Sequence, residues 1–251
     1  MKIANVGLAV PRFEKSKNIN TGLEKLEDHV RIGISVDCVI FGFDENELKV
    51  LLIKSDLKKY EGKWSLLGDL VNSNEDIEEA AYRVLKERTG LDDVYLEQVR
   101  AFGQVKRHPA ARVITIAYCS LVNVQHYQVD GSKNELNWLP VSSVKEMAFD
   151  HKQILDTCYG WLQKRIQEHP LGFNLLPKKF SLRELQNLYE AILNAKLDRR
   201  NFRKKFFSID LLIDTGEYEA DMPHRPGKLY RFNYNKYEKK ERKKWVGIDF
   251  W

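Results

Sequence analysis

The chain has 251 residues, of which 43% are hydrophobic and 31% charged, and its formal net charge is +5. This length allows two domains with a sizeable core, and no apolar run approaches the ~20 residues that a membrane-spanning helix needs. The N-terminus lacks the pattern of a secretory signal, and the three cysteines have no metal-ligand spacing. We therefore expect a cytoplasmic protein with buried free thiols and no membrane partner.

Charge is unevenly distributed along the chain. Residues 172–251 contain 18 Lys and Arg against 11 Asp and Glu, whereas residues 1–171 contain 23 against 25. A basic second part after a near-neutral first part indicates that only the second part meets a polyanion. The alternative is a solvated basic tail, because the stretch KYEKKERKK carries much of the excess.

The apolar pattern predicts several strands and helices in the first part. Alternating apolar residues predict a strand at 30–43, followed by a turn and a hairpin partner at 48–54. Asp150 is placed to cap a later helix that has an apolar stripe. Further strands are expected at 94–105, 113–122 and 138–140, and helices at 144–147 and 151–167.

The stretch from Trp64 to Leu91 reads as a strand end, a loop and one amphipathic helix. Acidic residues open this helix, apolar residues recur at helical spacing, and Thr89-Gly90 ends it. The loop and helix resemble a Nudix box, G-x5-E-x7-R-E-U-x-E-E-x-G-U, where U is a large aliphatic residue. The matching positions are Glu75, Arg83, Leu85, Glu87, Gly90 and Leu91.

Three positions depart from this box. Asp69 replaces the first glycine, while Val84 and Arg88 replace two of the three clustered glutamates that bind magnesium in the family. A guanidinium ~4 Å from a divalent ion, at an effective dielectric of ~20, is repelled by roughly 8 kcal/mol. We therefore expect a Nudix scaffold without a metal, a cofactor or pyrophosphatase activity.

The second part predicts a winged helix-turn-helix. Ser181 and Glu184 form a capping-box pattern, and Asp198 is placed to cap a second helix at 199–207. Two short strands at 211–213 and 229–232 then predict a wing. Basic side chains and an asparagine suit phosphates and base edges, so we expect DNA binding, with a basic protein-interaction surface as the alternative. The predicted DNA-binding residues are Arg199, Arg200, Asn201, Arg203, Lys204, Arg225 and Lys228.

A Nudix-like domain followed by FSLxELQxLYEAIL, DRRNFRKK and GKLYRF resembles the NrtR family of Nudix-related transcriptional regulators, over about residues 30–234. The resemblance implies a bacterial homodimer that senses a metabolite and binds a double-stranded DNA operator. The expected fold is α+β, a Nudix-like α/β/α sandwich with a mixed sheet before a C-terminal winged helix. We expect an arm at 1–28, the Nudix-like domain at 29–169, a linker at 170–179 and the winged helix at 180–251.

The resemblance leaves the effector open. Some members respond to ADP-ribose and others control sugar catabolism, including arabinose use; the motif L-L-G-D and His108 depart from the ADP-ribose pattern. We favour a sugar such as a pentose, with ADP-ribose or another nucleotide as the alternative. A third possibility is an active Nudix hydrolase with a nucleic-acid-binding appendage. Candidate effector-binding residues are Trp64, Asp69, Glu87, Arg88, Arg107, Asp150 and His151.

Overall fold

The structure, a computed structural model, describes residues 32–44, 46–91, 94–124, 136–169, 175–220 and 226–241. The arm expected at 1–28, Arg225 of the expected wing and residues 170–174 of the expected linker lie outside these ranges. Among the described helices, none combines the length and apolar character needed to cross a bilayer.

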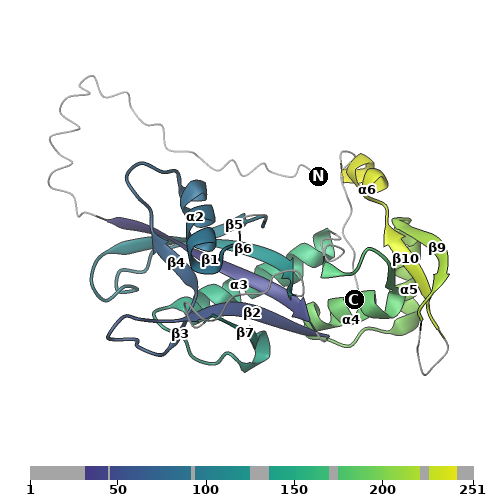
Figure 1. Cartoon of the computed structure of the whole chain (residues 1–251), viewed down its shortest axis with the longest axis horizontal. Coiled ribbons are helices and arrows are strands. Elements are labelled where there is room, and N and C mark those ends of the chain that lie inside the picture. Colours follow the sequence, from purple (N-terminus) through teal and green to yellow (C-terminus); the bar gives the residue numbers. More distant parts are fainter. Residues whose placement is uncertain are drawn as a thin grey trace, which may run out of the picture. The chain divides into compact units, whose positions relative to one another are not determined.

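A seven-stranded mixed sheet forms the centre of the first part (Figure 1). Its strands follow the order β3-β2-β1-β6-β5, with β4 paired to β1 and β7 paired to β2. The long strands β1 and β6 run parallel, and the other pairs are antiparallel. The strand bounds are β1 (Gly33–Asp44), β2 (Glu47–Lys54), β3 (Trp64–Ser65), β4 (Leu67–Leu70), β5 (Glu97–Phe102), β6 (Val113–Asn123) and β7 (Asn137–Pro140).

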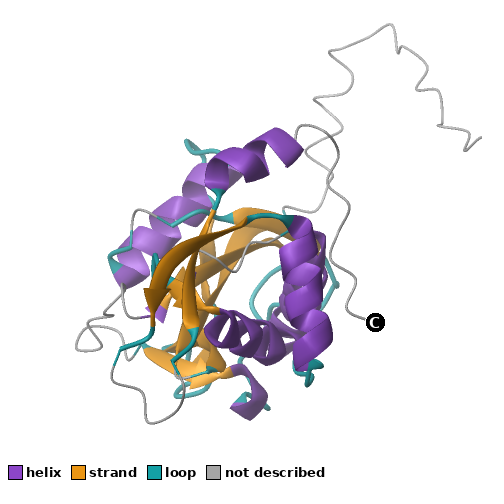
Figure 2. Cartoon of the chain, turned by 90° about the vertical axis from the view of Figure 1, so that its right-hand side faces the viewer, coloured by secondary structure: helices purple, strands orange, loops and turns teal. Residues whose placement is uncertain are grey.

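Alternation along β1 divides the core into two layers. Val36, Cys38 and Ile40 pack in one cluster with α2 (Ile77–Thr89), whereas Val39 and Phe41 pack in another with α3 (His151–Glu168). Successive side chains of a strand point to opposite faces of the sheet, so the run of buried apolar residues from Cys38 to Phe41 requires cover on both faces. Figure 2 shows helices on both sides of the strands. The expected α/β/α sandwich is confirmed.

Local capping signals fix the ends of α2. The Asp76 side chain and that of Glu79 form a reciprocal capping box at the N-terminus. Gly90 ends the helix with a φ of 78°, in the left-handed region that glycine adopts without a Cβ penalty. The helix therefore has the bounds that its sequence indicates.

Two local expectations around α3 are wrong. The helix expected at 144–147 is absent; a 3-10 turn, η2 (Val141–Ser143), precedes it, and Val144 and Met147 are buried in the core instead. Core packing of these two side chains decides the path of this segment over its weak local helical preference. Asp150 stands at the N-cap of α3, but its carboxylate binds Arg107 rather than the helix N–H groups.

The C-terminal part is a winged helix. Its elements are β8 (Phe180–Ser181), α4 (Leu182–Leu193), α5 (Arg199–Ile209), β9 (Leu212–Tyr218), β10 (Lys228–Phe232) and α6 (Tyr234–Glu241). The capping box of α4 is confirmed, since Ser181 and Glu184 bond reciprocally, and the Asp198 carboxylate accepts from the Asn201 N–H at 2.8 Å. Phe202 and Phe206 of α5 are buried and both rings contact that of Tyr189 of α4.

The two parts share one hydrophobic cluster. Residues of α3 and of α4 and α5 belong to the same cluster, which also contains the buried Leu175 and Leu176. The Gln163 side chain on α3 donates to the Ile192 carbonyl on α4 at 3.1 Å, and Asn123 on β6 donates to the Leu175 carbonyl at 2.9 Å. A change of orientation between the two parts would therefore disturb buried packing.

Candidate functional site

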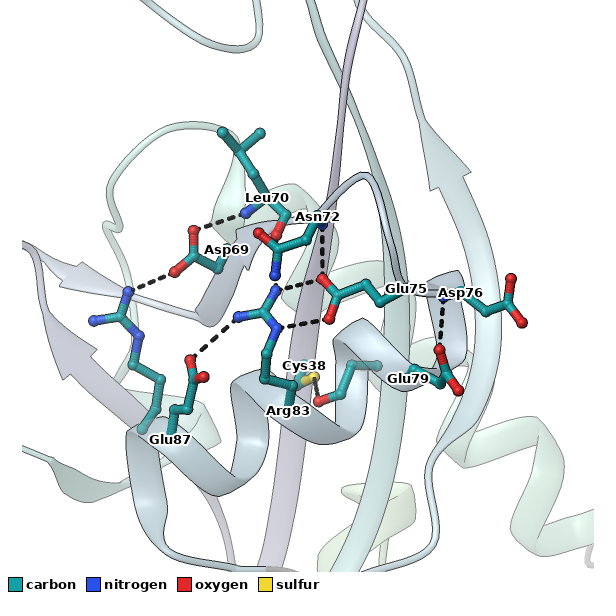
Figure 3. Close-up of polar contacts among 11 residues, drawn as sticks. Cys38, Asp69, Leu70, Asn72, Glu75, Asp76, Glu79, Arg83 and Glu87 are labelled. Carbon is teal, nitrogen blue, oxygen red and sulfur yellow. Dashed lines mark hydrogen bonds and ion pairs between the residues drawn. The ribbon is translucent and has the colours of Figure 1, made fainter.

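The helix α2 carries an ordered polar network (Figure 3). The Arg83 guanidinium donates to both oxygens of Glu75, at 2.7 and 2.8 Å, and reaches Glu87 at 3.2 Å. The same guanidinium also donates to the Leu70 carbonyl at 2.9 Å. The hydrogen bond from Arg83 lowers the pKa of Glu75 to about 2. This network ties the loop before the helix to the helix itself, so it has a structural use that needs no metal.

Of the three residues that depart from the box, Val84 lies in the apolar core, and Asp69 and Arg88 form an ion pair. Val84 is fully buried in the cluster between α2 and the sheet. Arg88 contacts the Asp69 carboxylate at 3.1 Å, so two of the three departing residues pair with each other. Within the described ranges, no three metal-ligating side chains gather. Magnesium prefers hard oxygen ligands, and an aliphatic residue and a guanidinium at positions 84 and 88 do not fit it.

A cavity of about 960 Å³ opens beside this helix. Segments far apart in sequence line it: the start of β1, the end of β2 with the loop after it, β4, the 107–111 loop and the N-terminus of α3. Four of the predicted effector-binding residues line it, namely Asp69, Arg88, Arg107 and His151. The other three, Trp64, Glu87 and Asp150, lie outside its lining.

The three residues outside the lining have other contacts. Trp64 packs against the hydrophobic core with the Lys54 Nζ 3.7 Å from its ring centroid. Glu87 bonds to Arg83, and Asp150 to Arg107. These contacts hold the three side chains away from the cavity. Residue type and spacing, on which the prediction rested, do not reveal such contacts.

A buried ionic network forms the floor of the cavity. Arg107, whose side chain is 3% exposed, makes a bidentate pair with Asp150 at 2.8 and 2.9 Å and reaches Asp37 at 3.4 Å. Asp37 also accepts from the Thr115 hydroxyl at 2.7 Å. Gly68 must lack a side chain here, because a Cβ would lie 2.2 Å from an Asp37 oxygen. The sequence analysis missed Asp37, although a lone carboxylate in an otherwise apolar strand is a usable signal.

His151 is neutral in this network. Its Nδ1 accepts from the Leu66 N–H at 3.0 Å, and a backbone amide can only donate, so Nδ1 carries no proton. The Ser65 hydroxyl bonds to the same nitrogen at 3.0 Å. The proton therefore sits on Nε2, 3.5 Å from an Asp37 oxygen. Burial lowers the pKa of His151 below its usual value, which agrees with this assignment.

The winged helix presents a basic surface on α5. Arg199, Arg200, Asn201, Arg203 and Lys204 are all exposed. In the described part of the chain, none of the four basic residues among them forms an ion pair. These charges are available to phosphates without breaking an internal contact.

Part of this surface is a groove of about 500 Å³ between α4, α5 and the wing. Arg199, Arg203 and Lys228 line it together with Arg183, which the sequence analysis did not single out. Lys228 pairs with Asp214 at 2.8 Å, and Arg183 with Glu219 at 3.0 Å. Arg200, Asn201 and Lys204 lie on α5 outside the groove lining. Of the predicted DNA-binding residues that the structure describes, three therefore line one groove, and the other three lie elsewhere on α5.

Family models match both parts of this architecture. The NUDIX domain model matches residues 31–158, and the NrtR DNA-binding winged helix domain model matches residues 172–232. A Nudix domain followed by a winged helix defines a class of DNA-binding regulators rather than of single-domain hydrolases. The chain belongs to the NrtR family of Nudix-related transcriptional regulators.

Individual relatives agree with this membership. The ADPR responsive transcriptional repressor NtrR of Acinetobacter baylyi is 32% identical over 210 residues, which cover 82% of this chain and 84% of the relative. The ADP-ribose pyrophosphatase of Methanocaldococcus jannaschii is 27% identical over 64% of this chain and 92% of its own length. The Shewanella oneidensis NrtR structure with a 27mer DNA superposes with a TM-score of 0.69 at 30% identity, covering 79% of this chain and 93% of that one.

Proposed function

We propose that this chain is a transcriptional repressor that ADP-ribose, or a closely related nucleoside diphosphate sugar, releases from its operator. The carrying observation is the 960 Å³ cavity with Arg88 and Arg107 in its lining, in a chain 32% identical to an ADPR responsive repressor. The winged helix, with the exposed basic residues Arg199, Arg200, Arg203 and Lys204 on α5, is the DNA-binding part. We retain the expectation of a homodimer, because two winged helices double the base readout of one.

The size of the cavity favours a nucleotide over a free pentose. Ligand pockets for drug-sized molecules measure roughly 300–1,000 Å³, and this cavity lies near the top of that range. A pentose would leave most of it filled with water. The comparisons also offer no support for the arabinose branch that the sequence analysis favoured. We therefore place the nucleotide alternative first.

Arg88 is the residue that we assign to the diphosphate. Its pair with Asp69 is exposed on both sides, at 36% and 42%, and such pairs contribute only ~0–1 kcal/mol to stability. The guanidinium can therefore exchange one carboxylate for a phosphate oxygen at small cost. Arg107 is unsuited to such an exchange, because its own side chain is 3% exposed and its carboxylate partners Asp37 and Asp150 are only 6% and 12% exposed. Its assigned role is to hold the cavity floor in shape.

The helix α3 is the element that we assign to signal transmission. Its first residue, His151, lines the cavity, and Gln163, roughly 18 Å further along at ~1.5 Å per residue, bonds to α4 of the winged helix. A ligand that shifts the N-terminus of α3 must move or strain this contact, since the helix and its buried packing are stiff. Effector and operator would then favour different placements of α4.

Hydrolysis of nucleoside diphosphates is expected to be absent. Purified protein with ADP-ribose and magnesium should release no AMP above the rate without protein, because positions 84 and 88 supply no metal ligand. The matched test is the single variant Arg88→Glu, which restores the carboxylate beside Glu87 without placing a charge at the fully buried Val84, and which is expected to bind magnesium more tightly than the wild-type chain. Turnover by the wild-type chain that disappears in Glu87→Gln would contradict this assignment.

Calorimetric titration tests the proposed effector. ADP-ribose is expected to bind the wild-type chain, whereas arabinose and ribose are not expected to produce heat or a thermal shift. Arg88→Ala should weaken ADP-ribose at least ~10-fold, the loss of one charge-assisted contact of about 1.4 kcal/mol or more. Arabinose binding with no response to ADP-ribose would return the pentose hypothesis to first place.

A further inference from the structure

A cluster of aromatic rings lies at the cavity, and its members come from two loops and from the segment that leads into α3. The Phe149 ring lies 4.5 Å from the Tyr60 ring, 5.3 Å from His108 and 4.9 Å from His151, measured between centroids. The Phe149 and His108 planes differ by only 11°, so these two rings are stacked. Phe149, His108 and His151 line the cavity, and Phe149 and His108 keep part of their surface exposed.

The backbone of Phe149 is strained. Its φ is 51°, in the left-handed region that a bulky residue rarely adopts. Its neighbours hold it there: the Ala148 N–H donates to the Trp64 carbonyl at 2.8 Å, Asp150 is clamped by Arg107, and the His151 ring is held by Leu66. Such strain persists only where surrounding contacts over-determine it, and it concentrates at binding sites. The surroundings thus force this ring into place at the cavity.

We infer that Phe149, stacked with His108, is the platform for the planar base of the effector, and that it sets the preference for a nucleotide over a base-free sugar phosphate. This inference rests on the proposed function and names the part of the cavity that reads the base. A ring face offers stacking to a flat heteroaromatic group, and it offers no charge-assisted contact to a phosphate.

The charge state of the cluster agrees with a neutral base. Burial and the neighbouring Arg107 lower the pKa of His108, and burial lowers that of His151. Both imidazoles are therefore uncharged near neutral pH and present π faces to a neighbouring ring. The cationic group assigned to phosphate, Arg88, belongs to α2, a different element of the lining. The aromatic rings and the cationic group assigned to phosphate therefore come from different elements of the cavity lining.

Phe149→Gly tests the inference, because glycine accepts the left-handed backbone and removes only the ring. ADP-ribose should bind ~5–150-fold more weakly than to wild type, the range that loss of one base–aromatic stack produces. Ribose 5-phosphate, which lacks the base, should bind wild type and variant within about threefold of each other. Phe149→Tyr keeps the ring and is expected to keep ADP-ribose affinity.

The outcomes separate the subsite from the proposed function. Unchanged ADP-ribose affinity in Phe149→Gly overturns the platform and leaves the proposed function standing, as does an equal loss for ribose 5-phosphate. Failure of ADP-ribose and AMP to bind the wild-type chain overturns both. Should the glycine variant not fold, Phe149→Leu, which keeps apolar bulk without a ring, is expected to show the same selective loss, and wild-type affinity in that variant overturns the platform.

Discussion

Arg107→Ala is expected to destabilise the folded chain by about 3–5 kcal/mol, the cost of leaving buried charges without their partner. The guanidinium is 3% exposed, and its removal strands Asp37 and Asp150, of which Asp37 is almost equally buried. Urea unfolding, compared at equal m-value, measures the change. Because the same residue holds the cavity floor, ADP-ribose binding should be lost together with stability.

Arg88→Ala is the matched control for this variant. It also removes one guanidinium from a carboxylate in the same cavity, but this pair is exposed, so the stability change should stay within ~1 kcal/mol. A cost below 1 kcal/mol for Arg107→Ala would show that water or rearrangement compensates the stranded carboxylates, contrary to the assignment of a buried floor.

Operator affinity is expected to fall at least ~30-fold in the double variant Arg199→Ala plus Arg203→Ala, since each arginine contact with DNA contributes roughly 1–3 kcal/mol. Both side chains are exposed in the groove beside the wing, so the fold should be unaffected. Fluorescence anisotropy with labelled operator, at two or more salt concentrations, measures the change. Each arginine that contacts a phosphate adds ~0.9 to the salt slope, so the variant should show a shallower slope.

The double variant Lys152→Ala plus Lys164→Ala controls for net charge. It also removes two positive charges, but from α3, where each lysine pairs with an acidic residue one turn away. Operator affinity should remain near that of wild type. An equal loss in both double variants would mean that overall charge, and not the α5 surface, determines DNA binding.

Local features of the fold were predictable because their signals lie within a few residues. The capping boxes at Asp76 and Ser181 and the cap at Asp198 each follow from side chains within one helical turn. The alternating apolar residues at 30–43 likewise predicted the strand β1. The helix prediction at 144–147 was wrong because the path of this segment is set by the packing of its buried side chains. Their partners in the core come from distant parts of the sequence.

The site was predictable only in part because it depends on long-range contacts. Arg107 meets Asp37 across 70 positions and Asp150 across 43, and no local pattern reports either pair. For the same reason the sequence indicated a helix cap at Asp150, whose carboxylate in fact binds the distant Arg107. Phe149 gave no signal at all, since its importance rests on a backbone angle and on rings from two other loops.

Reciprocal binding is the most direct test of the central claim that effector and operator act against each other through α3. ADP-ribose is titrated calorimetrically into the free chain and into the chain saturated with operator DNA. The dissociation constant should rise ~5–150-fold on the operator, and ADP-ribose should weaken operator binding by the same factor, as linkage requires. Equal ADP-ribose affinity in the two states would contradict control of DNA binding by this effector.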